Sequence, residues 1–297
     1  MRALGGNIDI GWGAETLAAA LDALPDYRVL RRLQPPAPFG RPSRRVWSGV
    51  VLDVETTGLS RGKDAIIELA MQRIGIDARG RIVEIGSPQR WLEDPGVPIP
   101  TDVSRLTGIT DAAVAGRSIN EAVATSMLLD ADWALAHNAA FDRGFVEARL
   151  PGATERPWIC SMSDVDWRAR GFEGRSLSQL VWQTGRFFDA HRADMDVAAL
   201  IHLVGHESAG RGETVIIEAI RNARRVGWVV EARDAPFASK DVLRARGYRW
   251  RSEVRHWWRE VPDNRRVEET AWCEREVYHG HGSPVVRRVD WTNRYAS

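Results

Sequence analysis

The sequence predicts an α/β fold in which a mixed central sheet is flanked by helices. The run GVVLDVE from Gly49 is apolar and β-rich, as a buried central strand is. Two further strand-like runs follow at residues 66–76 and 81–91, separated by a turn at 77–80. After Pro100 the pattern changes to helices that alternate with short strands. A sheet of this kind needs helices on its faces to bury its apolar side chains.

The other expected elements follow in chain order. An amphipathic helix at residues 14–24 and a Pro- and Arg-rich connector at 34–43 form an N-terminal extension. Beyond Pro100, periodicity predicts two strands and three helices, with the strands at 133–137 and 158–160 and the helices at 139–149, 176–185 and 192–205. These elements belong to one α/β domain.

A polar stretch at residues 205–213 marks a boundary, and six of the thirteen tryptophans follow it. A short helix after Pro236, strands at 248–250 and 256–258, and a last helix predict a small α+β domain. We therefore expect three units, which are an N-terminal extension over 1–47, a main domain over 48–206 and a Trp- and Arg-rich C-terminal module over 207–297.

Composition narrows the class of protein. The 297 residues are 44% hydrophobic and 27% charged, which is typical of a globular protein. No signal-like segment and no run of eighteen apolar residues occurs, so we expect a cytoplasmic protein that does not enter a membrane. Cys160 and Cys273 lack the spacing of a disulfide framework or a zinc site, and we expect buried thiols.

The net charge of +1 does not by itself indicate a nucleic-acid partner. Two arginine clusters stand out against it, one between residues 28 and 45 and one between 244 and 259. Arginine is also the general surface cation of this chain, because it contains very little lysine. The clusters alone therefore leave binding and solvation equally open.

The motif DVETTG places two carboxylates at the end of the first strand. Alternation along a strand points Asp53 and Glu55 to the same face. Two acids held together repel one another, and Mg²⁺ bound by carboxylate oxygens relieves that repulsion. Backbone N–H groups of the turn formed by Thr56, Thr57 and Gly58 can meet a nucleotide. Paired acids at a strand end can also simply be solvated.

Two further motifs supply acids and a histidine. In HNAAFD, Asp142 can add a third carboxylate or merely favour the positive end of a helix, Asn138 can cap that helix, and Phe141 can belong to the core. In HRADMD, Asp196 lies inside an expected helix and faces the sheet, while His191 lies on the preceding loop. A lone loop histidine is usually incidental, and its neighbours here make catalysis the better reading.

Together the three motifs resemble those of the DEDDh exonucleases, the DnaQ-like group that includes the epsilon subunit of DNA polymerase III, ribonuclease T and oligoribonuclease. The resemblance covers roughly residues 48–205 and includes LTGIT at 106–110. It implies a ribonuclease H-like fold with two divalent ions, Mg²⁺ or Mn²⁺, among four acids, and His191 as general base. Tyrosine-type relatives carry their base where this chain has Arg192. The implied metal ligands are Asp53, Glu55, Asp142 and Asp196, and the implied substrate contacts are Thr56, Thr57, Gly58, Leu106, Thr107, Asn138 and Phe141.

The function expected from these residues is a metal-dependent 3'-5' exonuclease. Single-stranded DNA is the favoured partner, in repair or processing, and RNA is the main alternative because the acids do not distinguish the sugars. A polymerase-associated proofreading or accessory subunit is the other alternative, with a polymerase or clamp partner left open. The C-terminal module resembles small units with a Phe, Lys-Asp, Gly-Tyr-x-Trp and Trp-Trp pattern that are appended to nucleic-acid enzymes. Its tryptophans can form a core or a stacking surface, and we expect most of them to be core.

Overall fold

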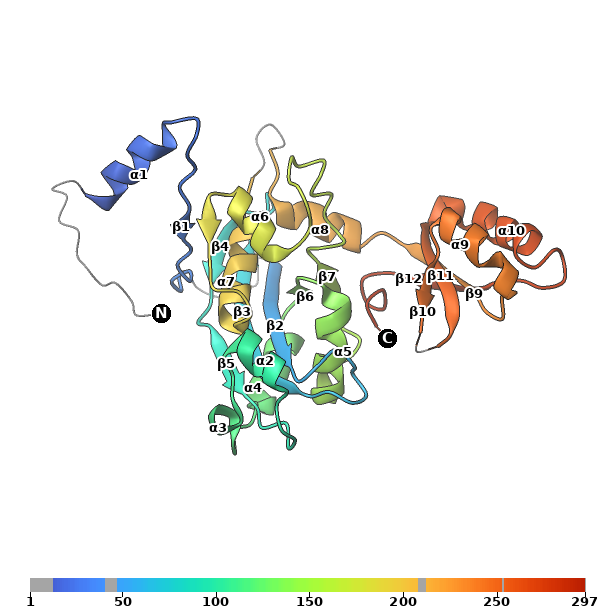
Figure 1. Cartoon of the computed structure of the whole chain (residues 1–297), viewed down its shortest axis with the longest axis horizontal. Coiled ribbons are helices and arrows are strands. Elements are labelled where there is room, and N and C mark those ends of the chain that lie inside the picture. The colour runs from blue at the N-terminus through green and yellow to red at the C-terminus, as the bar shows by residue number, and fades with distance from the viewer. Residues whose placement is uncertain (1–12, 41–46, 208–211, 253, 297) are drawn as a thin grey trace.

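The computed structural model describes residues 13–40, 47–207, 212–252 and 254–296. Figure 1 shows a main body built on one sheet and a smaller unit beside it that has a sheet of its own. Residues 41–43 of the expected connector, together with Arg44 and Arg45 of the first arginine cluster, lie outside the described residues. Within those ranges, no helix is long and apolar enough to cross a membrane.

The main sheet is mixed, which confirms the expected fold class. Its order is β4-β3-β2-β6-β7, and β5 also pairs with β3. The pairs of β3 with β2, β4 and β5 are antiparallel, whereas β2 with β6 and β6 with β7 are parallel. The strands are β2 (Trp47–Thr56), β3 (Ile66–Ile76), β4 (Ile82–Ile85), β5 (Gln89–Leu92), β6 (Trp133–Ala136) and β7 (Trp158–Cys160).

Helices cover both faces of this sheet because alternate residues of the central strands point in opposite directions. Val51 packs in a core with α6, α7 and α8, while Val50 and Leu52 pack with α4 and α5. The short helices α2 and α3 close a smaller cluster at one end. The helices are α2 (Thr101–Thr107), α3 (Asp111–Val114), α4 (Glu121–Leu129), α5 (Ala139–Arg149), α6 (Leu177–Gln183), α7 (Ala193–Val204) and α8 (Val215–Ala223).

The expectation of one strand over residues 81–91 was wrong, because the structure forms two. β4 pairs with Ile74–Ile76, and β5 pairs with Glu68–Met71 farther along β3. Between them lie Gly86, Ser87 and Pro88, and a proline has no N–H to give to a sheet. The chain therefore leaves the sheet edge and rejoins it.

The N-terminal extension is attached to the main body through a short strand pair. Helix α1 (Ala14–Asp22) precedes β1 (Arg31–Arg32), which pairs in parallel with β8 (Arg186–Phe187). Leu33 is buried in the core on the α7 side of the sheet, and Arg32 lies 2.7 Å from Asp189 in an ion pair. The extension thus supports the loop that leads to His191.

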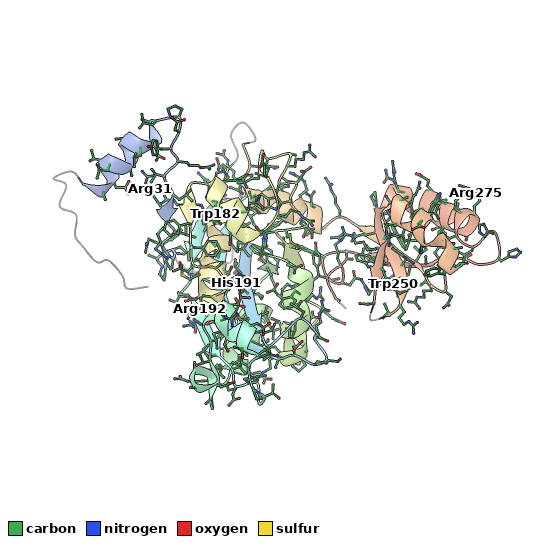
Figure 2. The ribbon with its side chains drawn as sticks, in the orientation of Figure 1. Arg31, Trp182, His191, Arg192, Trp250 and Arg275 are labelled. Carbon is green, nitrogen blue, oxygen red and sulfur yellow. The ribbon has the colours of Figure 1, made fainter. Side chains whose placement is uncertain are left out.

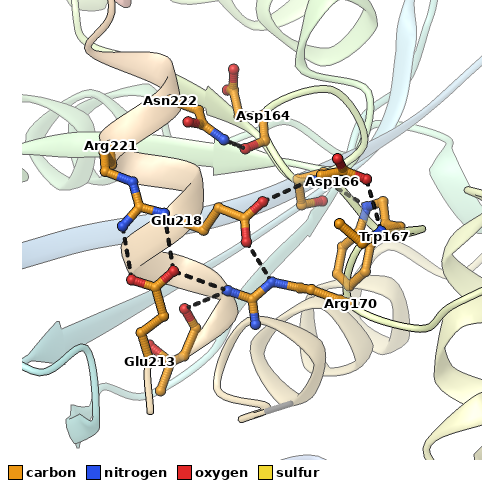
Figure 3. Close-up of polar contacts among 11 residues, drawn as sticks. Asp164, Asp166, Trp167, Arg170, Glu213, Glu218, Arg221 and Asn222 are labelled. Atoms are coloured by element: carbon orange, nitrogen blue, oxygen red, sulfur yellow. Dashed lines mark hydrogen bonds and ion pairs between the residues drawn. The ribbon is translucent and has the colours of Figure 1, made fainter. Parts of the chain in front are cut away.

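The nine-residue helix α8 was not expected from the sequence, and it packs on the main body. Its apolar side belongs to the same core as the sheet and α7. Figure 3 shows the polar contacts that fix it, in which Arg170 Nε lies 2.6 Å from a Glu218 carboxylate oxygen and the Asp166 N–H donates to Glu218 at 2.8 Å. The Arg221 guanidinium also donates two hydrogen bonds, of 2.8 and 3.0 Å, to the Glu213 carboxylate in a bidentate ion pair. Breaking the buried Arg170–Glu218 pair would leave an uncompensated charge.

The smaller unit, over residues 227–289, has a four-stranded antiparallel sheet and its own core. Val230, Leu243, Tyr248 and Val261 are buried there, and three tryptophans pack against them while Trp250 is 49% exposed. The elements of the smaller unit are β9 (Gly227–Ala232), α9 (Lys240–Arg246), β10 (Arg249–Arg251), β11 (His256–Pro262), α10 (Arg266–Glu276) and β12 (Val285–Val289). Cys160 of the main body and Cys273 of the smaller unit are both buried free thiols, as expected.

After β12 the chain returns to the main body. The Trp158 N–H donates to the Trp291 carbonyl at 2.7 Å, and the Tyr295 hydroxyl donates to Asp164 at 2.8 Å. Tyr295 lies in the same core cluster as Trp158. The division after residue 206 stays a prediction, and the larger core draws on residues beyond it. A chain cut there would lose α8 and this returning tail.

Candidate metal centre and active site

Three carboxylates meet at the carboxyl end of β2. Asp53 and Glu55 share one face of the strand, and Asp196 reaches them from the first turn of α7. One oxygen from each of the three lies within 4.8 Å of the others. All three side chains are half-buried. Asp196 is held in place because its Oδ2 accepts a hydrogen bond of 3.1 Å from the Arg192 backbone N–H.

The fourth expected acid, Asp142, lies beside this cluster but outside its closest set. It belongs to the first turn of α5 and is only 2% exposed. Its Oδ1 accepts a hydrogen bond of 3.3 Å from the backbone N–H of Val54, which lies between Asp53 and Glu55 on β2. The structure thus brings all four acids to one place, and Asp142 is more buried than the other three.

Burial and mutual repulsion raise the pKa values of these acids. Burial, with a further contribution from Asp196, raises the pKa of Glu55 to about 8. Burial likewise raises the pKa of Asp142 to about 8 and that of Asp196 to about 6. For Asp53, burial and then the charge of Asp142 raise the pKa well above its ordinary value. Without added positive charge the four carboxyls cannot all ionise near neutral pH.

These residues fit divalent cations. Carboxylate oxygens are the hard ligands that Mg²⁺ and Mn²⁺ prefer, and several of them converge here. Their raised pKa values show that the protein itself does not neutralise them. A cation bound among them would favour the charged form of each acid and remove the repulsion.

A fifth acid, Glu68, was missed from the sequence. It lies on β3 directly opposite Glu55 and has no exposed surface. It pairs with Arg90, lies 3.8 Å from Arg192, and accepts a hydrogen bond of 2.9 Å from the Ala193 backbone N–H. Glu68 thereby fixes the start of α7. An acid in the apolar strand IIELA was the signal available in the sequence.

His191 lies on the loop immediately before α7, as expected. Its backbone has a φ of 66°, a left-handed conformation that few residues other than glycine adopt. Within the part of the chain that the structure describes, its exposed side chain has no hydrogen-bond partner. Figure 2 shows His191 next to Arg192, where Glu68 holds the start of the helix. The imidazole is thus accessible while the backbone beneath it is fixed.

In the turn after β2, the hydroxyl groups of the two threonines expected to contact substrate make hydrogen bonds within the turn itself. The Thr56 hydroxyl donates to the Gly58 carbonyl at 2.6 Å, and the Thr57 hydroxyl accepts from the Ala65 N–H at 3.0 Å. A Cβ at Gly58 would lie 2.7 Å from the Asp64 carboxyl, so a larger residue there would displace the side chain that accepts from the Ser60 N–H. Any nucleotide contact of this turn would come from its backbone.

Leu106 and Thr107 have different environments. Leu106 is 56% exposed, whereas Thr107 is buried and its hydroxyl donates to the Val103 carbonyl and accepts from the Ile109 N–H. The structure thus gives Thr107 a role inside the α2 turn and leaves Leu106 accessible. Substrate binding by either residue stays a prediction.

The residues of the HNAAFD motif also differ in their environments. Asn138 is the N-cap residue immediately before α5, has a left-handed conformation and makes no side-chain capping hydrogen bond, while Phe141 is partly buried with its ring 4.9 Å from that of Phe145. His137 accepts from the Ser161 hydroxyl and donates to the Arg175 carbonyl, both at 2.7 Å. Burial lowers the pKa of His137 to about 4, so it is neutral and structural.

The mixed sheet, with acids from β2 and α7 at one edge and Asp142 of α5 beside them, has the architecture of the ribonuclease H-like exonuclease fold. The chain belongs to the RNase T exonuclease family, whose model matches residues 50–204. The resemblance predicted from the three motifs is confirmed, and residues 50–204 form an exonuclease domain of this family.

The similar proteins are much longer than the region that matches this chain. The 3'-5' exonuclease DinG of Bacillus subtilis is 38% identical over 164 residues, which cover 52% of this chain and 17% of DinG. The PolC-type DNA polymerase III of Clostridium perfringens is 40% identical over 103 residues, 34% of this chain and 7% of the polymerase. This chain therefore spans a small part of these relatives.

Among solved structures, exonuclease X in complex with 5' overhanging duplex DNA has a TM-score of 0.40 and 24% identity, covering 57% of this chain and 99% of that one. The zinc-bound complex of E. coli exonuclease I with single-stranded DNA has a TM-score of 0.49 and 14% identity, covering 83% of this chain and 66% of the other.

Proposed function

We propose that this protein removes nucleotides one at a time from the 3' end of single-stranded DNA, using two divalent cations, Mg²⁺ or Mn²⁺. The observation that carries the proposal is the convergence of Asp53, Glu55 and Asp196 within 4.8 Å, with buried Asp142 beside them. The relatives include an enzyme described as a 3'-5' exonuclease, which supports the direction. The role lies in DNA repair or processing, in the cytoplasm.

The reaction is hydrolysis of the last phosphodiester bond. When bound, a pair of divalent cations supplies positive charge that acidifies the attacking water and stabilises the leaving oxygen. The four carboxylates hold that charge in a fixed place, and an imidazole nitrogen of His191 accepts the proton of the attacking water. The new P–O bond forms as the bond to the 3' oxygen breaks, and the departing 3' oxygen takes a proton from solvent water. The products are a nucleoside 5'-monophosphate and a strand that ends in a 3' hydroxyl.

The residues around the acids prepare this geometry. Glu68 and Arg192 fix the start of α7, so Asp196 and His191 keep a constant spacing along one short segment. The exposed position of His191 leaves room for a strand to enter before the imidazole closes over the phosphate. A positioned base of this kind contributes roughly a hundredfold or more to the rate.

The test uses three 5'-labelled substrates, which are single-stranded DNA, duplex DNA and the RNA of the same sequence. Each is incubated with Mg²⁺, with Mn²⁺ or with EDTA. We expect a ladder of shortening labelled DNA in either metal, none in EDTA, and none when the 3' end is blocked by phosphorothioate linkages. Release of the label as a mononucleotide, or cutting from within, would overturn the assigned direction. Faster hydrolysis of the RNA would assign the enzyme to RNA instead.

A further inference from the structure

The small sheet of residues 227–289 has one face that its own helices leave uncovered. The sheet order is β10-β11-β9-β12, and its core consists of alternate residues such as Val230 and Val261 packed against α9 and α10. Residues one position out of step with these point to the opposite face. We call that side the open face. Its members at the surface are Arg249, Arg251, Trp258, Glu260, Val285 and Arg287, whereas Val229, Glu231 and His256 on the same side are buried.

The register aligns an aromatic ring with cations across the open face. Trp258 is paired with Arg249 on one neighbouring strand and with Glu231 on the other. The guanidinium of Arg251 lies 4.8 Å from the centre of the Trp258 ring. Arg287 is two strands away from Trp258, on β12, opposite Val229. Aromatic rings and guanidinium planes are the surfaces on which unpaired bases stack.

The acids of the open face are already neutralised. Glu231 pairs with Arg233 at 2.6 Å, and Glu260 pairs with Arg294 at 2.8 Å, and neither arginine is among the open-face residues. Among the described residues, Arg249, Arg251 and Arg287 have no carboxylate partner. The face therefore carries an excess of three positive charges, which complements a phosphate backbone.

The helix side of the same sheet is different. Arg246 and Arg259 both bind the buried carboxylate of Glu269, at 3.1 and 3.2 Å, and Arg246 also stacks over Trp272. These two arginines, although part of the cluster that is conspicuous in the sequence, are committed to internal contacts. Within the cluster, Arg246 and Arg259 are therefore structural, whereas Arg249 and Arg251 lie on the open face.

The open face is turned toward the main body. Glu260, which belongs to it, binds Arg294 of the returning tail, and Arg294 also donates to the carbonyls of Ala223 and Arg225 at the end of α8. In Figure 1, α9 and α10 lie on the side of the small sheet that is away from the main body. The open face thus lies on the main-body side of the small unit.

We propose that the open face binds the single strand that lies upstream of the bond being cut, with Arg249, Arg251 and Arg287 on phosphates and the Arg251–Trp258 stack against a base. The proposal rests on the proposed function, since it takes the strand as substrate. Single strands are the fitting partner because stacking on Trp258 requires a base that is free of its complement. The chain thereby gains affinity for longer strands without touching the reaction.

The experiment compares two triple variants in an Asp196→Ala background, which prevents hydrolysis. One is R249Q/R251Q/R287Q. The matched control, R244Q/R265Q/R275Q, removes the same charge from exposed arginines outside the open face. Affinity is measured by fluorescence anisotropy with labelled oligo-dT of about 30 and about 6 nucleotides, one longer than a typical single-strand site and one near its lower limit.

We expect the open-face variant to bind the long strand about tenfold more weakly or worse, and the short strand unchanged. The slope of log affinity against log salt should fall by about two, since each lost single-strand phosphate contact is worth about 0.7. Trp258→Ala should weaken long-strand binding by roughly fivefold or more, and Trp258→Phe should restore most of it. The control triple should match its parent, and circular dichroism should show that every variant folds.

Equal long-strand affinity for the open-face and control triples would overturn the proposal. Hydrolysis by proteins with Asp196 intact separates this outcome from failure of the proposed function. If the wild type degrades single strands but the open-face triple binds them normally, only the docking surface is wrong. If the wild type degrades no strand, the proposed function is wrong. Loss of self-association in light scattering, with strand affinity unchanged, would instead make the face a contact between copies of this chain.

Discussion

The two sheets of this chain concentrate opposite charges. The main sheet, the start of α5 and the start of α7 gather four acids whose pKa values are raised, while the neighbouring Arg90 and Arg192 pair with Glu68. The small sheet gathers arginines on its open face, and there the acids are the neutralised partners. Each region is built so that one kind of charge is left in excess.

The difference teaches what each region requires from outside. Excess carboxylate favours bound cations and excess guanidinium favours phosphate, so under the two proposals above metal ions complete the first site and a strand completes the second. Removing an excess charge should relieve repulsion and abolish function, whereas removing a neutralised one should mainly disturb structure. The predictions below test that distinction.

The largest effect is expected from removing a carboxylate of the metal centre. Asp53→Ala and Asp196→Ala should each reduce hydrolysis to the level seen in EDTA, because each takes away a cation ligand. Their melting temperatures without metal should hold or rise, since carboxylate repulsion is relieved. Activity and differential scanning calorimetry measure the two effects, with exposed Asp26→Ala as the control. Robust cleavage at saturating Mg²⁺ would refute the metal assignment.

Removing the base should slow the reaction while leaving the cation ligands in place. His191→Ala should lower kcat by roughly a hundredfold or more, with little change in strand affinity. The residual rate should recover in part as pH rises, because hydroxide then replaces the missing base. Single-turnover assays across the pH range measure this, and exposed His279→Ala provides the control. An unchanged rate near neutral pH would make His191 a structural residue.

A smaller effect is expected from Glu68, whose charge is neutralised. Glu68→Gln keeps the shape but weakens its pairing with Arg90 and its hold on the Ala193 N–H, so Asp196 and His191 lose their fixed spacing. Changes of this kind behind a metal ligand typically cost tenfold to a hundredfold. We expect a lower kcat and a higher Mg²⁺ requirement with unchanged strand affinity. Glu84→Gln, a buried acid on β4, is the matched control, and an equal loss there would indicate general destabilisation.

The smallest effect concerns stability without metal. The pKa of Glu55 rises from 4.5 to about 8 on folding and that of Asp196 from 3.8 to about 6, so the native state holds more protons than the unfolded chain. This stabilisation is full below the unfolded pKa values and is lost as pH rises through the native ones. In EDTA the melting temperature should therefore fall by a few degrees from pH 5 to 8.

The control for that slope is Glu55→Gln, which lacks one of the titrations and should give a flatter curve. Added Mg²⁺ should stabilise the wild type more at pH 8 than at pH 5, because the ligands must be ionised to bind it. A melting temperature in EDTA that rises with pH to the same extent in both proteins would contradict the account of uncompensated acids.

Local patterns predicted the elements that carry the motifs. The strand expected at 66–76 and the helix expected at 139–149 have the bounds of β3 and α5. These segments have clear periodicity and end in turns, so neighbouring residues specify them. Asp53, Glu55 and Asp196 could be placed for the same reason, because each lies near the end of an element whose direction the pattern indicates.

What depended on distant pairing was not predicted. Glu68 becomes part of the site only because β3 pairs with β2 in a register that sets it opposite Glu55. The two-residue pair of β1 with β8 and the return of Tyr295 to the core likewise join segments far apart in the sequence. Helix α8 followed a polar stretch that suggested a boundary, and its burial is decided by the core that it completes.

The first residue of β9 and the last of β12 are paired neighbours, Gly227 with Val289. The small unit therefore leaves and re-enters the rest of the chain at a single point, about 5.5 Å wide or less by the geometry of an antiparallel pair. It is a cassette. Arg294, bound to Glu260 of the small unit and to the carbonyls of Ala223 and Arg225, adds a third connection beside these two chain segments. Another compact domain whose two ends lie equally close could replace it, and the exonuclease domain would then carry a different binding surface.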